Sequence, residues 1–210
     1  MEKDTQISKR LSWLLRHGAI KEGVDIQTDG FVRVDSITEH PKFKRDFTLE
    51  VLKNIVAKDK KQRYSLRQNN NGFYEIRANQ GHSIAVVQDS HCLQRIYNAS
   101  EVNLAVHGTY YRNWQRILKE GLRTMKRLHI HFSVSDKVEQ SGSKDIILSG
   151  FRSDCEILIY LNVQKAIQVG GMEIYRSTNN VILCSGINGC IPKIYFSKVI
   201  DRHTGTLLPF

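Results

Sequence analysis

Long apolar runs, paired cysteines and glycine-rich phosphate loops are all missing from this chain of 210 residues. No apolar stretch approaches the roughly 20 residues that a membrane-spanning helix needs. The first ten residues, MEKDTQISKR, lack the apolar core of a signal peptide. We therefore expect a protein that is neither exported nor inserted in a membrane.

The cysteines and the familiar catalytic motifs exclude further classes. The four cysteines show no CxxC pairing and no histidines at zinc-finger spacing, so structural zinc is not expected. Reduced, buried thiols are the default reading, and they favour the cytosol or the nucleus. GxGxxG, the P-loop lysine motif and the GxSxG elbow are absent, which excludes the usual dinucleotide, triphosphate and α/β-hydrolase sites.

Acidic residues are scarce relative to basic ones. Lysine and arginine total 31 against 21 aspartates and glutamates, which gives a net charge of +10 and a pI near 9.5. The excess is spread along the chain: residues 1–92 hold 16 basic and 12 acidic side chains, and residues 93–210 hold 15 and 9. A basic balance favours polyanionic partners, nucleic acid first, although charge alone does not exclude a protein that is basic by accident.

The N-terminal half has the pattern of helices followed by a hairpin. Apolar spacing predicts an amphipathic helix over residues 7–17, ended by Gly18 as a C-terminal cap. A short extended segment (TDGFVRV), a short helix (VDSITEHPKF) and a helix over about 49–58 follow. The stretch KQRYSLRQNNNGFYEIRA alternates around an Asn-Gly turn and predicts a β-hairpin. Together these elements predict a winged-helix-like lobe over residues 1–92.

The C-terminal half is richer in strands. The stretch QDSHCLQRIYNASEVN is polar and only weakly periodic, so we place the domain boundary there. Strands are expected at NLAVHGT, LHIHFSV, EILIYLNV and KIYFSKVI, with one helix at YYRNWQRILKEGL. This pattern predicts an α+β lobe over residues 93–210 with a mixed sheet.

Two histidine patterns in this half are candidates for chemistry. His129 and His131 share one face of a strand, but no carboxylate or cysteine stands at a matching metal-ligand spacing, so we interpret them as one wall of a pocket. The HGT triplet at residues 107–109 ends an apolar strand, where glycine lets the backbone approach a ligand. An ordinary strand-end turn is the more frequent meaning of such a triplet, so both readings stay open.

Six blocks in order make the chain similar to a known family. ISKRLSWLLRHGA, KDKKQRYSL, ANQGHSI, VHGT, KRLHIHFSVS and SGFRSDCEILIYLNV resemble the motifs of the NAD-dependent RNA 2′-phosphotransferase family, from about Ile7 to Val163. The stretch RSTNNVILCSG is similar too.

The resemblance implies a fold and a reaction. Members pair a winged-helix lobe with an ADP-ribosyltransferase-like lobe that binds NAD as a co-substrate, with no metal. They transfer an internal RNA 2′-phosphate, such as that at a tRNA splice junction, to NAD. The products are RNA with a 2′-hydroxyl, ADP-ribose 1″,2″-cyclic phosphate and nicotinamide. A cleft between two lobes of one chain needs no partner subunit, so we expect a monomer.

The same resemblance assigns roles to individual residues. The catalytic set that handles the RNA phosphate is Arg16, His17, Arg63 and Arg127. The residues assigned to NAD are His107, Gly108, Thr109, His131, Ser133, Gly150 and Arg152. Arginine stays protonated and offers a planar fork to phosphate oxygens, so the arginines position and stabilise charge. His17 either transfers a proton or only grips phosphate, and cations in a helix's last turn are favourable in any case.

Some features leave alternatives open. No glutamate is evident where protein-modifying ADP-ribosyltransferases activate an acceptor; we interpret Glu139 and Glu156 as surface or strand-edge residues and His82 as structural. One alternative is an enzyme that caps phosphorylated nucleic-acid ends with ADP-ribose. Another is a non-catalytic nucleic-acid-binding sensor of NAD or ADP-ribose.

Overall fold

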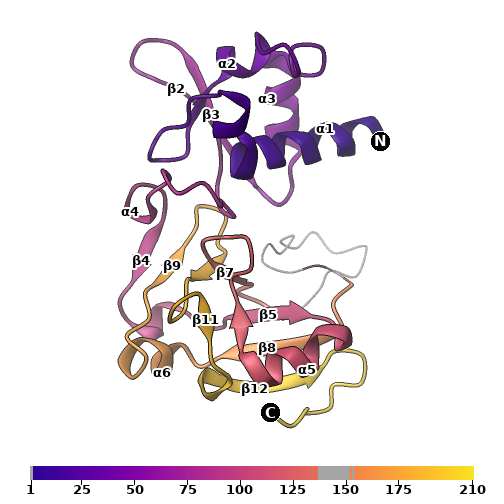
Figure 1. Cartoon of the computed structure of the whole chain (residues 1–210), viewed down its shortest axis with the longest axis vertical. Coiled ribbons are helices and arrows are strands. Elements are labelled where there is room, and N and C mark those ends of the chain that lie inside the picture. Colours follow the sequence, from indigo (N-terminus) through magenta and orange to yellow (C-terminus); the bar gives the residue numbers. More distant parts are fainter. Residues whose placement is uncertain (1, 137–151, 153) are drawn as a thin grey trace. The chain divides into compact units, whose positions relative to one another are not determined.

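The computed structural model describes residues 2–136, 152 and 154–210 (Figure 1). Its internal contacts divide the chain into two compact units, Met1–Cys92 and Leu93–Phe210. Within the described residues, no helix is both long enough and apolar enough to cross a bilayer. The class predicted from the sequence, a mixture of helices and strands, is confirmed.

Three helices of unit 1 overlap the predicted ones: α1 (Glu2–Trp13), which begins five residues earlier than expected, α2 (Val34–Thr38) and α3 (Leu49–Lys58). A short helix that the sequence did not predict, α4 (Asp89–Cys92), lies in the expected boundary stretch. Thr48 caps α3, because its hydroxyl accepts a hydrogen bond from the backbone N–H of Val51 at 3.2 Å.

The predicted cap at Gly18 is wrong. Helical backbone continues past α1 as a π-helical turn (Leu14–Gly18) and a 3₁₀ turn (Ile20–Glu22), and the left-handed cap is Gly23, with φ of +70°. Gly18 is required for a different reason: a Cβ there would lie 2.6 Å from the ring of Trp13. The glycine therefore makes room for an aromatic side chain rather than ending the helix.

The sheet of unit 1 contains the predicted hairpin. Strands β1 (Val32–Arg33), β3 (Tyr74–Ala78) and β2 (Tyr64–Gln68) follow one another in that spatial order, all antiparallel. The β2–β3 turn uses Gly72 at φ of +82°, a conformation that favours glycine. The helices close one core against this sheet, built on fully buried residues that include Leu11, Leu15 and Ile76.

Unit 2 holds several small sheets. One has the order β4 (Gln94–Ile96), β9 (Ile174–Arg176), β10 (Ile182–Cys184), β7 (Ile130–Phe132). Another has the order β12 (Phe196–Asp201), β8 (Ile157–Leu161), β5 (Val106–Thr109), as Figure 1 shows. β6 (Leu122–Arg123) pairs with β11 (Cys190–Ile191). The helices of this unit are α5 (Tyr111–Glu120) and α6 (Val163–Gln168).

The predicted mixed sheet of this unit is wrong. Every strand pairing among the described residues is antiparallel. A tight connection explains one of these pairs: β9 and β10 are joined by a short turn in which Ser177 N donates to Val181 O at 3.0 Å, and parallel neighbours would need a long crossover. The bridge between Val106 and Ser133 joins β5 to β7.

Candidate functional site

Arg16 and His17 lie on the π-helical turn that follows α1. Leu14 and Leu15 are fully buried, so this turn is anchored in the core of unit 1. Its next two side chains leave the core: Arg16 is half-buried and His17 is exposed. π-helical turns inside helices frequently occur at functional sites, because they change the direction in which side chains project.

The loop after β3, residues 79–83, contacts both of these residues. Ser83 donates its backbone N–H to the carbonyl of Arg16 at 2.9 Å, and its hydroxyl lies 2.8 Å from Nδ1 of His17. Gly81 has φ of +88°, and a Cβ built there would lie 3.4 Å from Nε of Arg16. The guanidinium of Arg16 therefore packs against the backbone of Gly81, and its Nε and Nη2 atoms are shielded from solvent.

The same loop also holds the segment that carries Arg63. Asn79 donates its backbone N–H to the carbonyl of Arg63 at 2.8 Å and its side-chain amide to the carbonyl of Gln62 at 2.7 Å. Ser65 donates its hydroxyl to Oδ1 of Asn79 at 2.6 Å, which fixes the orientation of that amide. One loop thus connects the adjacent residues Arg16 and His17 to Arg63, which is far from them in the sequence.

Arg63 is paired and still partly exposed. Its Nη1 donates to Oδ1 of Asp59 at 2.6 Å, and its backbone N–H donates to Oδ2 at 2.5 Å. The arginine side chain keeps 36% of its surface exposed, whereas the aspartate keeps 6%. In the part of the chain that is described, no other partner engages this guanidinium. Asp59 therefore orients Arg63 and leaves Nε and Nη2 available for a phosphate.

Asn79, Ser83 and Asp59 are residues that the sequence analysis did not single out. The signal for the first two was their place in the ANQGHSI block, directly after a strand. His82, in the same block, is buried and packs against Gly30. A Cβ atom on residue 30 would lie 3.2 Å from Nε2 of His82. A structural role for His82 stays a prediction.

In unit 2 the HGT triplet ends β5, and His107 has a defined tautomer. Its Nδ1 lies 2.9 Å from the carbonyl oxygen of His131, which can only accept, so Nδ1 carries the proton. Burial lowers the pKa of His107, the hydrogen bond to His131 partly opposes this, and the positive charge of Arg127 lowers it further. His107 is therefore neutral near pH 7, and Nε2 has a lone pair that can accept a hydrogen bond.

The strand with the two histidines lies beside β5. Val106 and Ser133 exchange backbone hydrogen bonds of 2.9 and 2.8 Å, which brings His107 to β7. His131 is 6% exposed and is in register with Leu183 of β10. Ser133 has no exposed surface, and its hydroxyl accepts from the N–H of Ser135 at 3.3 Å. The side chains of His131 and Ser133 are therefore both buried in this structure.

The other polar groups near β5 have structural partners. Thr109 is 4% exposed and accepts from the amide of Asn113 at 3.4 Å. Glu156 accepts from the backbone N–H of Tyr111 at 2.8 Å, at the start of α5, in keeping with its expected place beside a strand. His129 packs edge-on against Tyr175 at 6.1 Å between ring centroids. No group of three or more His, Cys, Asp or Glu side chains with metal-binding geometry occurs among the described residues.

Arg127 lies near His107, and Arg152 adds a second positive charge near Arg127. Partial burial lowers the pKa of Arg127, and the nearby charge of Arg152 lowers it further. Neither arginine forms an ion pair with a carboxylate of the described residues. Two guanidinium groups that repel each other, and that pair with no carboxylate among the described residues, favour an anionic ligand. Gly150 and Glu139 lie outside the described residues.

Comparison with known proteins finds relatives along most of the chain. Residues 2–186 match a family model described as RNA 2′-phosphotransferase, Tpt1/KptA family. The tRNA 2′-phosphotransferase 1 of Danio rerio is 36% identical over 93% of this chain and 85% of its own length. The tRNA 2′-phosphotransferase of Saccharomyces cerevisiae is 32% identical over 89% of this chain and 80% of its own length. A relative from Schizosaccharomyces pombe is 43% identical over 96% of this chain, which spans 52% of that relative's length.

Proposed function

The chain belongs to the RNA 2′-phosphotransferase (Tpt1/KptA) family, and on that basis we propose that it removes a 2′-phosphate from RNA and transfers it to NAD. The names of its relatives favour tRNA as the RNA. The observation that carries the proposal is the loop at residues 79–83, which holds Arg16, His17 and Arg63 in one place.

Unit 1 is proposed to hold the RNA phosphate. A 2′-monoester beside a 3′,5′-diester concentrates negative charge, and guanidinium forks bind such oxygens with two parallel hydrogen bonds. Arg63, oriented by Asp59, has donors left for this purpose. The hydroxyl of Ser83 contacts Nδ1 of His17, and we propose Nε2 as the atom that acts on the substrate. The tautomer then decides whether Nε2 donates to the phosphate or accepts a proton from the attacking ribose hydroxyl.

Unit 2 is proposed to hold NAD, and the residues present fit it. When bound, NAD supplies an electrophilic anomeric carbon with nicotinamide as the leaving group. The lone pair on Nε2 of neutral His107 suits a ribose hydroxyl. The two neighbouring positive charges of Arg127 and Arg152 suit a pyrophosphate. Arg127 also remains our candidate for stabilising negative charge on the transferred phosphate. The winged-helix-like and ADP-ribosyltransferase-like assignments of the two units, and the NAD contacts of His131, Ser133 and Gly150, are part of this proposal.

The experiment is a reaction with an oligonucleotide that carries one internal 2′-phosphate. With NAD present, mass spectrometry should find RNA with a 2′-hydroxyl, ADP-ribose 1″,2″-cyclic phosphate and nicotinamide. The control is the same oligonucleotide with the phosphate at its 5′ end, from which no nicotinamide should be released. Turnover without NAD, formation of NADH, or stable ADP-ribose on the 5′-phosphate would contradict the proposal, and the last result would favour end capping.

A further inference from the structure

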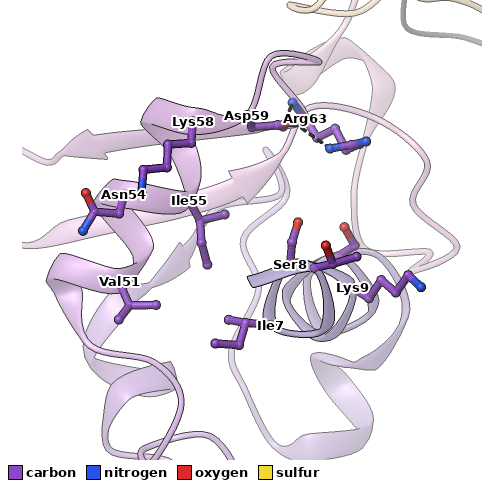
Figure 2. Close-up of a pocket in the computed structure, with 11 residues that line it drawn as sticks. Ile7, Ser8, Lys9, Val51, Asn54, Ile55, Lys58, Asp59 and Arg63 are labelled. Carbon is purple, nitrogen blue, oxygen red and sulfur yellow. Dashed lines mark hydrogen bonds and ion pairs between the residues drawn. The ribbon is translucent and has the colours of Figure 1, made fainter. Parts of the chain in front are cut away.

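A groove of about 610 Å³ lies within unit 1, between α1 and α3. Its volume falls in the range of about 300–1,000 Å³ that is usual for small-ligand sites. Figure 2 shows Ile7 of α1 facing Val51 and Ile55 of α3, with Asp59 and Arg63 at one end. The groove therefore has apolar walls and ends at an arginine that we propose to bind the 2′-phosphate.

The charge of the lining favours an anion. Lys9, Lys58 and Arg63 line the groove together with a single acid, Asp59, whose charge is already paired with Arg63. Neither lysine takes part in an ion pair within the described part of the chain, and both are exposed. A phosphodiester that leaves Arg63 along this groove would meet two unneutralised ammonium groups.

Two hydroxyl groups of α1 line the groove, those of Ser8 and Ser12. The Tyr64 hydroxyl lies 2.9 Å from the carbonyl oxygen of Ser8, and 3.1 and 2.5 Å from the hydroxyls of Ser8 and Ser12. A serine hydroxyl has two lone pairs that can accept from a ribose 2′-hydroxyl, which is the group that distinguishes RNA from DNA.

We propose that this groove binds the nucleotide that flanks the 2′-phosphate, with its base against the apolar walls and its phosphate near Lys58. The inference rests on the proposed function for the position of the 2′-phosphate at Arg63. It adds a subsite on the surface of unit 1 that reads RNA beyond the reacting nucleotide. Single-stranded RNA is commonly bound in this way, with bases on apolar surfaces and the backbone tracked by cations.

The test compares two RNA ligands, a mononucleotide with a 2′-phosphate, which has no flanking nucleotide, and a hexanucleotide with the 2′-phosphate near its middle. Binding is measured by fluorescence anisotropy over a range of salt concentrations, and turnover is measured in parallel. Lys58→Ala should weaken hexanucleotide binding about two- to fivefold and reduce the slope of log K against log salt by about 0.7, the share of one phosphate contact in a single strand. Binding of the mononucleotide should not change.

Lys44→Ala is the matched control, because Lys44 is an exposed lysine of the same unit that does not line the groove. Ser12→Ala should in addition reduce the preference for a hexanucleotide with ribose, rather than deoxyribose, next to the 2′-phosphate. If Lys58→Ala binds the hexanucleotide with the parent affinity and salt slope, or resembles Lys44→Ala, the groove is not a subsite. If the parent binds the hexanucleotide more tightly than the shorter ligand but releases no 2′-phosphate from either, the proposed function is wrong. The effect of Lys58→Ala on hexanucleotide binding then still decides whether the groove is a subsite.

Discussion

Replacing Ser83 with alanine removes the hydroxyl that lies 2.8 Å from Nδ1 of His17. The backbone hydrogen bond from Ser83 to the carbonyl of Arg16 does not depend on that side chain and is retained. The substitution therefore removes one hydrogen bond from the imidazole ring without disturbing the loop that supports Arg16 and Arg63. If His17 works through Nε2, a ring that has lost this contact presents that atom to substrate less often.

The size of the effect follows from one neutral hydrogen bond. Such a bond contributes about 1 kcal/mol net, which corresponds to roughly a fivefold change in rate. Ser83 and His17 are both exposed, so the free energy of unfolding should change by less than about 0.5 kcal/mol. We expect Ser83→Ala to lower kcat/KM about fivefold with an unchanged melting temperature. Ser83→Thr keeps a hydroxyl and should restore the parent rate.

The chain offers a matched control for this contact. The hydroxyl of Thr28 lies 2.9 Å from Nδ1 of His91, in the same unit and with both side chains exposed. Thr28→Ala removes the same type of bond from a histidine that has no part in the proposed site. The assay is steady-state release of the 2′-phosphate from an oligonucleotide at saturating NAD. The reasoning is refuted if Ser83→Ala retains the parent kcat/KM, or if Thr28→Ala loses as much.

Further predictions concern the phosphate, the buried histidine and metal ions. Arg63→Lys keeps the charge but loses the fork, so kcat/KM should fall by about 10²–10³, measured beside an unchanged far-ultraviolet circular dichroism spectrum; a loss below threefold would argue against a bidentate contact. The pKa of His107 is lowered in the folded protein. Below about pH 6.5 this histidine is therefore protonated in the unfolded chain while it is still neutral in the folded one, so protonation favours unfolding. The free energy of unfolding in urea should therefore fall more steeply from pH 7 to pH 5.5 in the parent than in His107→Gln, and equal slopes would contradict the assignment. Dialysis against EDTA should leave the rate of phosphate transfer nearly intact, since arginines are proposed to neutralise the charge, and recovery of a lost rate by Mg²⁺ would show that a metal ion does so instead.

Local sequence determined the helices and the hairpin of unit 1. Apolar residues at helical spacing predict α3, and an Asn-Gly pair between alternating runs predicts the β2–β3 turn, because both elements depend on residues close in sequence. The family blocks likewise name Arg16, His17 and Arg63, since a motif is a property of the chain itself. What lies near each of them is not written in the motif.

Tertiary structure alone decided how His17 is held. Ser83 is 66 positions from His17, so no periodicity relates them, and only the packing of the loop after β3 against the helical core brings them together. The antiparallel pairing in unit 2 likewise depends on which distant strands meet. Local propensity chooses elements within a few residues, whereas contacts between distant segments form only when the chain buries its apolar faces.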